Sequence, residues 1–173
     1  IIAQREFPIP DDADVEYVYD GLMQLGAELC IDTVDLVLST DGDVPSQPQQ
    51  ESEAHHVAPK IFKETCVIDF SLSARRIYDF VRGLSPVPGA WCMLTPRDAQ
   101  AKAQVLKVYK AAKTGESSNG VEVGTLKAEN RRLLVATVDE WLELVELQPA
   151  GKKRMAARDY LNGFQHPEDF LLK

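Results

Sequence analysis

The residues best suited to do chemistry in this sequence are basic ones that gather at three places in its latter part. Lysine and arginine neutralise phosphate groups, and a surface carrying several of them is typical of nucleic-acid-binding proteins. The alternative is an ordinary solvated face, since both residue types are exposed in most proteins. The basic residues concerned are Lys60, Lys63, Arg75, Arg76, Arg82, Lys152, Lys153, Arg154 and Arg158.

Aromatic residues for base stacking are scarce around these positions. Phe62, Tyr78, Phe80 and Trp91 are all plausible core residues. Recognition of the shape and backbone of a nucleic acid therefore fits better than reading of unstacked bases.

Other candidate chemistry has a simpler explanation. His55 and His56 could be imagined as metal ligands, but neighbours on an extended chain point in opposite directions, and we interpret them as part of a solvated linker. The acidic residues 11–16 lack the glycine and the final glutamate of a calcium loop, so we assign them to helix capping. The sequence holds no nucleophile elbow and no phosphate-binding glycine loop, and we assign no catalytic residue and no metal site.

The net charge of -8 hides an asymmetry between two parts of the chain. Residues 1–59 hold one basic and 13 acidic residues, a net charge of -12, whereas residues 60–173 hold 18 basic and 14 acidic residues, a net charge of +4. This asymmetry favours a basic, partner-binding part beside an acidic one. Three widely spaced cysteines favour a reducing, cytoplasmic location, and no apolar run is long enough to predict a membrane span.

The elements that must position these residues begin with an acidic, helical part. Residues 1–8 favour a short strand that stops at two prolines. A helix is then expected up to about residue 39, because Val15, Val18, Leu22, Leu25 and Leu29 recur at steps of three and four. This apolar stripe could drive self-association if no parent sheet covers it. Residues 40–58 have the polar, proline-containing composition of a linker.

The basic part, residues 59–173, is predicted to be mainly β-structure. Residues 59–70 look like a strand, and a short helix follows, in which Ala74, Ile77, Tyr78 and Val81 share one face. Five further strands are predicted at 91–94, 105–110, 121–127, 132–138 and 141–147, with a short helix at 156–161. Short strands at this spacing indicate a small sandwich or a barrel, and a barrel leaves fewer exposed edges.

Three segments together resemble the methionyl-tRNA formyltransferase family. They are residues 58–61 with 68–70, the run IYDFVRGLSPVPGAW at 77–91, and the run LQPAGKKRM at 147–155, which Leu161, Asn162 and Gly163 follow. Residues 1–8 and the helix after them look like the end of the family's N-terminal domain, so the resemblance extends over nearly the whole chain. Each motif alone is only moderately specific for the family, and their order along the chain makes the match specific.

The resemblance implies an α+β chain, mainly an OB-like barrel at 59–173 with short helices. Residues 1–39 would be a strand and helix remaining from a Rossmann-like catalytic domain, and 40–58 the linker. It implies formyl transfer from 10-formyltetrahydrofolate to initiator methionyl-tRNA, with the co-substrate and the catalytic Asn, His and Asp outside this chain, which would be inactive alone. Family linker lysines match Lys60 and Lys63 as tRNA contacts, and the charge argument adds Arg82, Lys152 and Lys153.

Two alternatives stay open at this point. One is the C-terminal barrel of a 10-formyltetrahydrofolate dehydrogenase or hydrolase, which the GKKRM run at 151–155 disfavours. The other is a free-standing RNA-binding module without catalysis.

Overall fold

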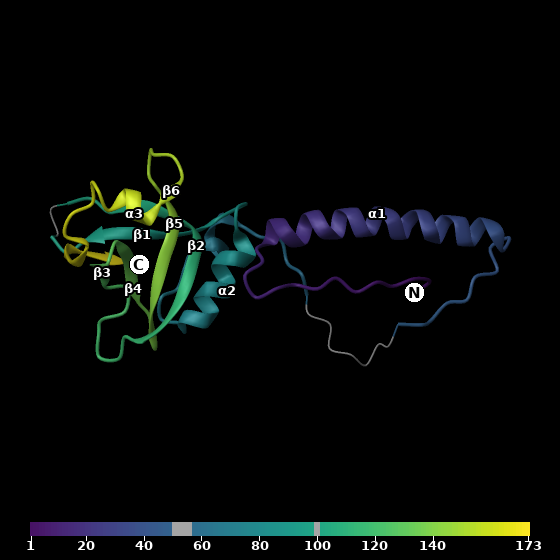
Figure 1. Ribbon diagram of the computed structural model, residues 1–173, viewed down its shortest axis with the longest axis horizontal. Coiled ribbons are helices and arrows are strands. Elements are labelled where there is room, and N and C mark those ends of the chain that lie inside the picture. Colours follow the sequence, from purple (N-terminus) through teal and green to yellow (C-terminus); the bar gives the residue numbers. More distant parts are fainter. Residues whose placement is uncertain (50–56, 99–100) are drawn as a thin grey trace. The chain divides into compact units, whose positions relative to one another are not determined.

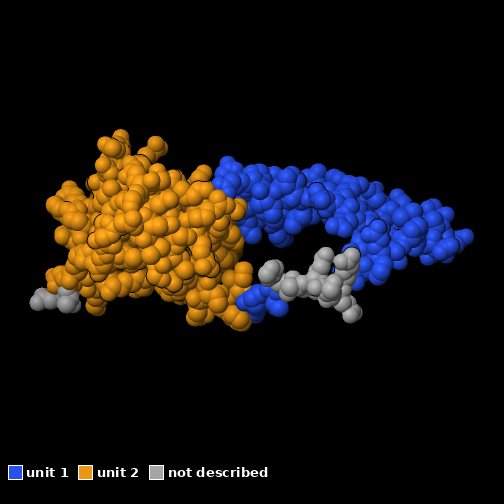
Figure 2. Space-filling view, turned by 90° about the horizontal axis from the view of Figure 1, so that it is seen from below, with its two compact units in different colours: residues 1–60 blue, residues 61–173 orange. Residues whose placement is uncertain are grey.

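The computed structural model describes residues 1–49, 57–98 and 101–173, and His55 and His56 lie outside them. The chain divides into two compact units, residues 1–60 and 61–173 (Figure 2). Among the described residues, no helix has the length and apolar character required to cross a bilayer.

The first unit is built on one helix, α1 (Val15–Ser39). It begins where predicted, because the Asp14 side chain accepts a hydrogen bond from the Tyr17 amide at 3.0 Å and caps the helix. The strand expected at residues 1–8 does not form. A strand needs a neighbour along its whole length, and the only pairing recorded in the described part of this segment is between Ile1 and Gln47, which exchange two backbone hydrogen bonds.

The second unit is a nearly closed antiparallel barrel with a few short helices (Figure 1). Its strands are β1 (Ala90–Pro96), β2 (Gln104–Ser117), β3 (Leu126–Glu129), β4 (Arg132–Ala136), β5 (Glu140–Pro149), β6 (Met155–Ala156) and β7 (Phe170–Leu172). They follow the order β3-β4-β5-β2-β1-β7, and β6 pairs with β5. The predicted barrel is confirmed.

Several boundaries differ from the prediction. Residues 59–70 hold a 3-10 turn, η1 (Lys63–Cys66), in place of a strand, and only Val67 makes a bridge, to Trp91. Strand β3 starts at Leu126 because the residues before it form turns, including a positive φ at Gly124. Strands β6 and β7 were not predicted, since segments of two and three residues carry no detectable alternation.

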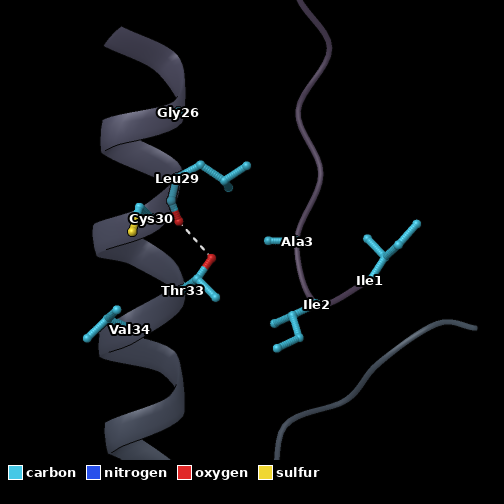
Figure 3. A pocket seen from close by; sticks show the side chains of 8 residues that line it. All are labelled: Ile1, Ile2, Ala3, Gly26, Leu29, Cys30, Thr33 and Val34. Carbon is cyan, nitrogen blue, oxygen red and sulfur yellow. Dashed lines mark hydrogen bonds between the residues drawn. The ribbon is translucent and has the colours of Figure 1, made fainter. Parts of the chain in front are cut away.

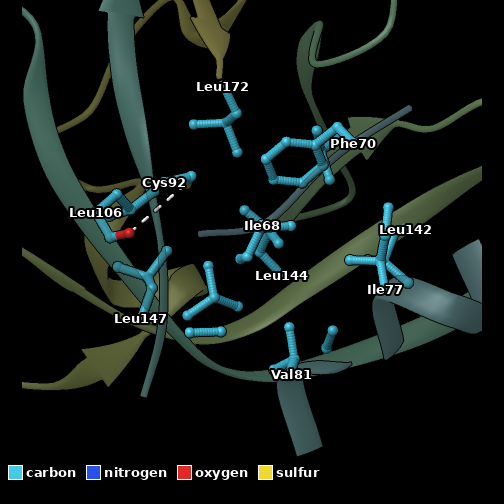
Figure 4. Packing of buried hydrophobic residues seen from close by; sticks show 14 of the residues in the cluster. Ile68, Phe70, Ile77, Val81, Cys92, Leu106, Leu142, Leu144, Leu147 and Leu172 are labelled. Atoms are coloured by element: carbon cyan, nitrogen blue, oxygen red, sulfur yellow. Dashed lines mark hydrogen bonds between the residues drawn. The ribbon is translucent and has the colours of Figure 1, made fainter. Parts of the chain in front are cut away.

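Helix α2 (Ala74–Leu84) packs its predicted apolar face into the barrel core. Ile77 and Val81 are 1% exposed, and each contributes roughly 1.5–3 kcal/mol through burial. Figure 4 shows Ile77 beside Leu142 of β5, in the same buried cluster as Val81, Ile68 and Leu144. The remaining short elements are α3 (Ala157–Tyr160) and η2 (Pro167–Asp169).

Candidate nucleic-acid interface

The five predicted phosphate-binding residues lie on separate elements. Lys60 is exposed at the end of the first unit, and Lys63 opens η1 in the second. Arg82 stands in the last turn of α2. Lys152 and Lys153 are exposed in the loop between β5 and β6.

A row of side chains across three strands connects Lys63 with Lys152. Trp91 of β1 pairs with Lys107 of β2, and Lys107 pairs with Gln148 of β5. Residues paired across antiparallel strands project from the same face of a sheet, and the chain neighbours of these three are buried in the barrel. The row therefore lies on the outer surface.

Short contacts fix both ends of this row. The Trp91 indole Nε1 donates to the Lys63 carbonyl oxygen at 2.9 Å, and the Lys63 ammonium lies 5.7 Å from the Trp91 ring centre. At the other end, the Gln148 Nε2 donates to the Lys152 carbonyl oxygen at 2.8 Å. Lys63 and Lys152, 89 positions apart in the sequence, are thereby tied to one surface.

An arginine stacked on a tyrosine extends the row. The Tyr109 hydroxyl donates to Gln148 Oε1 at 2.8 Å, and the Arg154 guanidinium carbon lies 4.5 Å from the Tyr109 ring centre. Two hydrogen bonds to Glu146, at 2.6 and 2.7 Å, hold the guanidinium in that position. We call the whole surface the basic–aromatic face; it comprises Lys63, Trp91, Lys107, Tyr109, Gln148, Lys152 and Arg154.

Arg82 belongs to a second cluster, around Tyr78. The Arg82, Arg75 and Lys113 cations lie 5.9, 6.0 and 4.8 Å from the Tyr78 ring centre. Asp79 accepts from Arg82 at 2.7 Å and from Arg75 at 2.8 Å. Burial acts to raise the pKa of Asp79, but the hydrogen bonds from Arg82 and Arg75 outweigh it and lower that pKa. The carboxylate stays charged and offsets part of the positive charge of Arg82.

Sequence reasoning missed most of the residues between Lys63 and Lys152. Lys107, Tyr109 and Gln148 alternate with buried residues, so strand periodicity could have placed them outside the barrel. The core assignment of the aromatic residues holds only in part. Trp91 packs against the core but is partly exposed, and Phe62 is 54% exposed.

The first unit offers a cavity of a different chemical character. It measures about 600 Å³ and lies between α1 and the N-terminal segment (Figure 3). The Thr33 hydroxyl donates to the Leu29 carbonyl oxygen at 2.7 Å, and none of the described residues that line this cavity has a charged side chain. It suits an apolar group and not a polyanion. Its lining residues are Ile1, Ile2, Ala3, Gly26, Leu29, Cys30, Thr33 and Val34.

Comparisons with known proteins agree on one family. The profile described as formyl transferase, C-terminal domain, matches residues 60–165. A methionyl-tRNA formyltransferase of Parabacteroides distasonis is 46% identical over 99% of this chain and 53% of its own length. One of Phocaeicola vulgatus is 43% identical over 95% of this chain and 51% of its own length. The chain thus spans about half the length of the curated relatives it matches.

A solved structure shows the same fold at low sequence identity. HypX from Aquifex aeolicus, in complex with tetrahydrofolic acid, aligns with 95% of this chain and 28% of its own, with a TM-score of 0.61 and 17% identity.

Proposed function

Because the chain belongs to the family of formyl transferase C-terminal domains, we propose that it is the tRNA-binding part of a methionyl-tRNA formyltransferase. Such an enzyme transfers a formyl group from 10-formyltetrahydrofolate to the amino group of initiator methionyl-tRNA, in the cytoplasm, at translation initiation. Residues 59–173 would dock the tRNA, residues 40–58 would be a linker, and residues 1–39 would close the catalytic domain. Of that linker, residues 50–56 lie outside the described part of the chain.

The observation that carries this proposal is the row that joins Lys63 and Lys152 across β1, β2 and β5. Lysine ammonium groups act as point charges toward phosphates, whereas the Arg154 guanidinium is already paired with Glu146 and serves to order this surface. The row lies on the outside of the barrel, where a folded RNA could contact it through its backbone. Residues 60–173 also carry a net positive charge, which favours a polyanion.

The relatives favour this function over the two alternatives. The relatives from Parabacteroides distasonis and Phocaeicola vulgatus are methionyl-tRNA formyltransferases, and they are 46% and 43% identical to this chain. The folate co-substrate would bind the catalytic half, and we propose no folate contact for residues of this chain.

Binding to initiator tRNA as a function of salt tests the proposal. We expect Lys63→Ala combined with Lys152→Ala to lower the affinity about tenfold. The slope of log affinity against log salt concentration should become shallower by roughly 1.4–1.8, because two phosphate contacts are lost. Fluorescence anisotropy with labelled tRNA measures both quantities.

The matched control is Lys102→Ala combined with Lys173→Ala. It removes the same charge from residues outside the basic–aromatic face and should leave the slope unchanged. Equal losses in both double variants would show that net charge alone drives binding, and the proposed face would be wrong.

A second test of the proposal concerns catalysis. Formyl transfer needs a base for the ammonium proton and a donor for the developing oxyanion. We expect the chain by itself to bind methionyl-tRNA without formylating it from 10-formyltetrahydrofolate. Formylated product from the purified chain would contradict this part of the proposal.

A further inference from the structure

A cleft beside the basic–aromatic face is lined by three arginines and by one carboxylate, that of Glu143. It has a volume of about 400 Å³ and lies between the β3–β4 turn, strand β5 and the start of α3. Its lining includes Val145, the residue before Glu146, which pairs with Arg154. At about 3.3 Å per residue of strand, Val145 stands roughly 10 Å along β5 from Gln148. The cleft and the face are therefore neighbours on the same strand.

The three arginines differ in how far acidic groups already satisfy them. Arg132 donates to Glu116 at 3.1 Å and lies 3.9 Å from Glu143, so it is largely neutralised. Arg158 lies 3.8 Å from Asp159 with 70% of its side chain exposed, and such a pair is weak. Over the described residues, no ion pair or side-chain hydrogen bond is recorded for Arg131. Arg131 and Arg158 therefore have donors left for an anion.

The backbone at Arg131 argues against a merely structural role for its side chain. Strands β3 and β4 are joined by a two-residue turn, with Asn130 at φ 51° and Arg131 at φ 62°. Both residues are left-handed, as in the tight hairpin turn that favours Asn followed by Gly. Asn130 fits that preference, but Arg131 occupies the position where glycine avoids the strain of a side chain. If residue 131 had only to form the hairpin turn, Gly would be more stable there than Arg.

We propose that the cleft binds a phosphate group of the docked RNA, with Arg131 and Arg158 as its donors. Arg131, from the β3–β4 turn, and Arg158, from α3, both line the cleft, and two guanidinium groups can give phosphate the planar recognition typical of arginine. The inference rests on the proposed function in taking RNA as the source of the phosphate. It assigns the RNA a second anchoring point, beyond the basic–aromatic face.

Arg131→Gly is the decisive variant because it separates folding from binding. We expect its melting temperature to equal or exceed that of the wild type, since glycine removes the strain of a side chain at a positive φ in the turn. Its affinity for initiator tRNA should fall five- to tenfold, and its salt slope should become shallower by roughly 0.7–0.9, the effect of one lost phosphate contact. Lys102→Ala, with the same change in charge, should alter neither the affinity for tRNA nor the salt slope. Wild-type affinity and slope in Arg131→Gly would overturn the inference.

A titration with inorganic phosphate tests the cleft without tRNA. Titrated into the full chain, it should shift the Arg131 and Arg158 Nε–Hε resonances in a saturable way, and the Arg158 shift should vanish in Arg131→Gly. If the wild-type chain does not bind tRNA, the proposed function is wrong. The phosphate titration then decides by itself whether the cleft binds phosphate. Unshifted resonances would then overturn the phosphate site as well.

Discussion

At the scale of single residues, Asp139 links helix α2 to the barrel through hydrogen bonds. Its Oδ1 atom accepts hydrogen bonds from the Ala74 amide and the Thr137 hydroxyl, both at 2.8 Å, and from the Glu140 amide at 2.9 Å. The bond from the Ala74 amide is the main cause that lowers the pKa of Asp139. A carboxylate from the β4–β5 turn thus caps a helix 65 positions earlier in the sequence.

Asp139→Ala should cost about 1–2 kcal/mol of unfolding free energy at neutral pH, because it removes this cap. The folded-state pKa lies below the unfolded value of about 3.9. The stabilisation by the charged group is therefore complete above that value and is lost as the pH falls through the folded pKa. Urea unfolding of both proteins at pH 7, 5 and 3 measures the difference.

Asp139→Asn is the control, since it keeps an acceptor oxygen and removes the charge. A wild-type advantage over Asp139→Ala that is as large at pH 3 as at pH 7 would show that the carboxylate charge plays no part.

At the scale of elements, the barrel closes where β7 meets the turn before β3. Thr125 forms a bridge with Leu171, and the Leu172 amide donates to the Gly124 carbonyl oxygen at 2.9 Å. A Cβ atom on Gly124 would lie 2.2 Å from the Leu172 carbonyl oxygen, and its φ is +85°. Only glycine permits this approach. Arg97 supports the closure through hydrogen bonds to the Thr125 hydroxyl and the Glu168 carbonyl oxygen, both at 3.1 Å.

Gly124→Ala should lower the unfolding free energy by about 2–4 kcal/mol, because the strain of a positive φ adds to a clash with backbone. Gly120→Ala is the matched control: its φ is +81°, but a Cβ atom there meets nothing within 4 Å. It should cost only about 1 kcal/mol. Chemical denaturation compares them, and equal losses would count against the closure at Gly124.

At the scale of the whole molecule, the first unit presents an apolar stripe that its own residues do not cover. Of the stripe predicted from sequence, Val15, Val18, Leu25 and Leu29 are only partly exposed, whereas Leu22 is 49% exposed. Another face of α1 carries Ile31, Val34 and Leu38, with exposures of 62%, 51% and 72%. Their spacing of three and four residues places them on one side of the helix.

We expect the chain to self-associate through this stripe, because burying three large apolar side chains is favourable. Ile31→Glu should shift the chain toward monomer. Sedimentation velocity over a range of concentrations measures the effect, with Val138→Glu, at a 54% exposed apolar residue of the barrel, as a charge-matched control. A wild-type chain that stays monomeric throughout would rule this out.

The sequence by itself determined the features that depend on neighbouring residues. Helices α1 and α2, the longer strands, the contrast in charge and the family motifs all follow from short-range pattern, because the periods of helix and strand are local properties. It also identified Lys63 and Lys152 as phosphate-binding candidates.

Only the tertiary structure decided which of these candidates share a surface. Strand register joins Lys63 to Lys152 through Trp91 and Gln148, and it leaves Arg82 in another cluster with Asp79. The closing strand β7 likewise forms only because β1, far earlier in the chain, supplies its hydrogen bonds, whereas the two-residue strand β6 pairs with the preceding strand β5. The physical reason is that pairing between strands is a non-local choice: it depends on how the whole barrel closes, and no single segment encodes it.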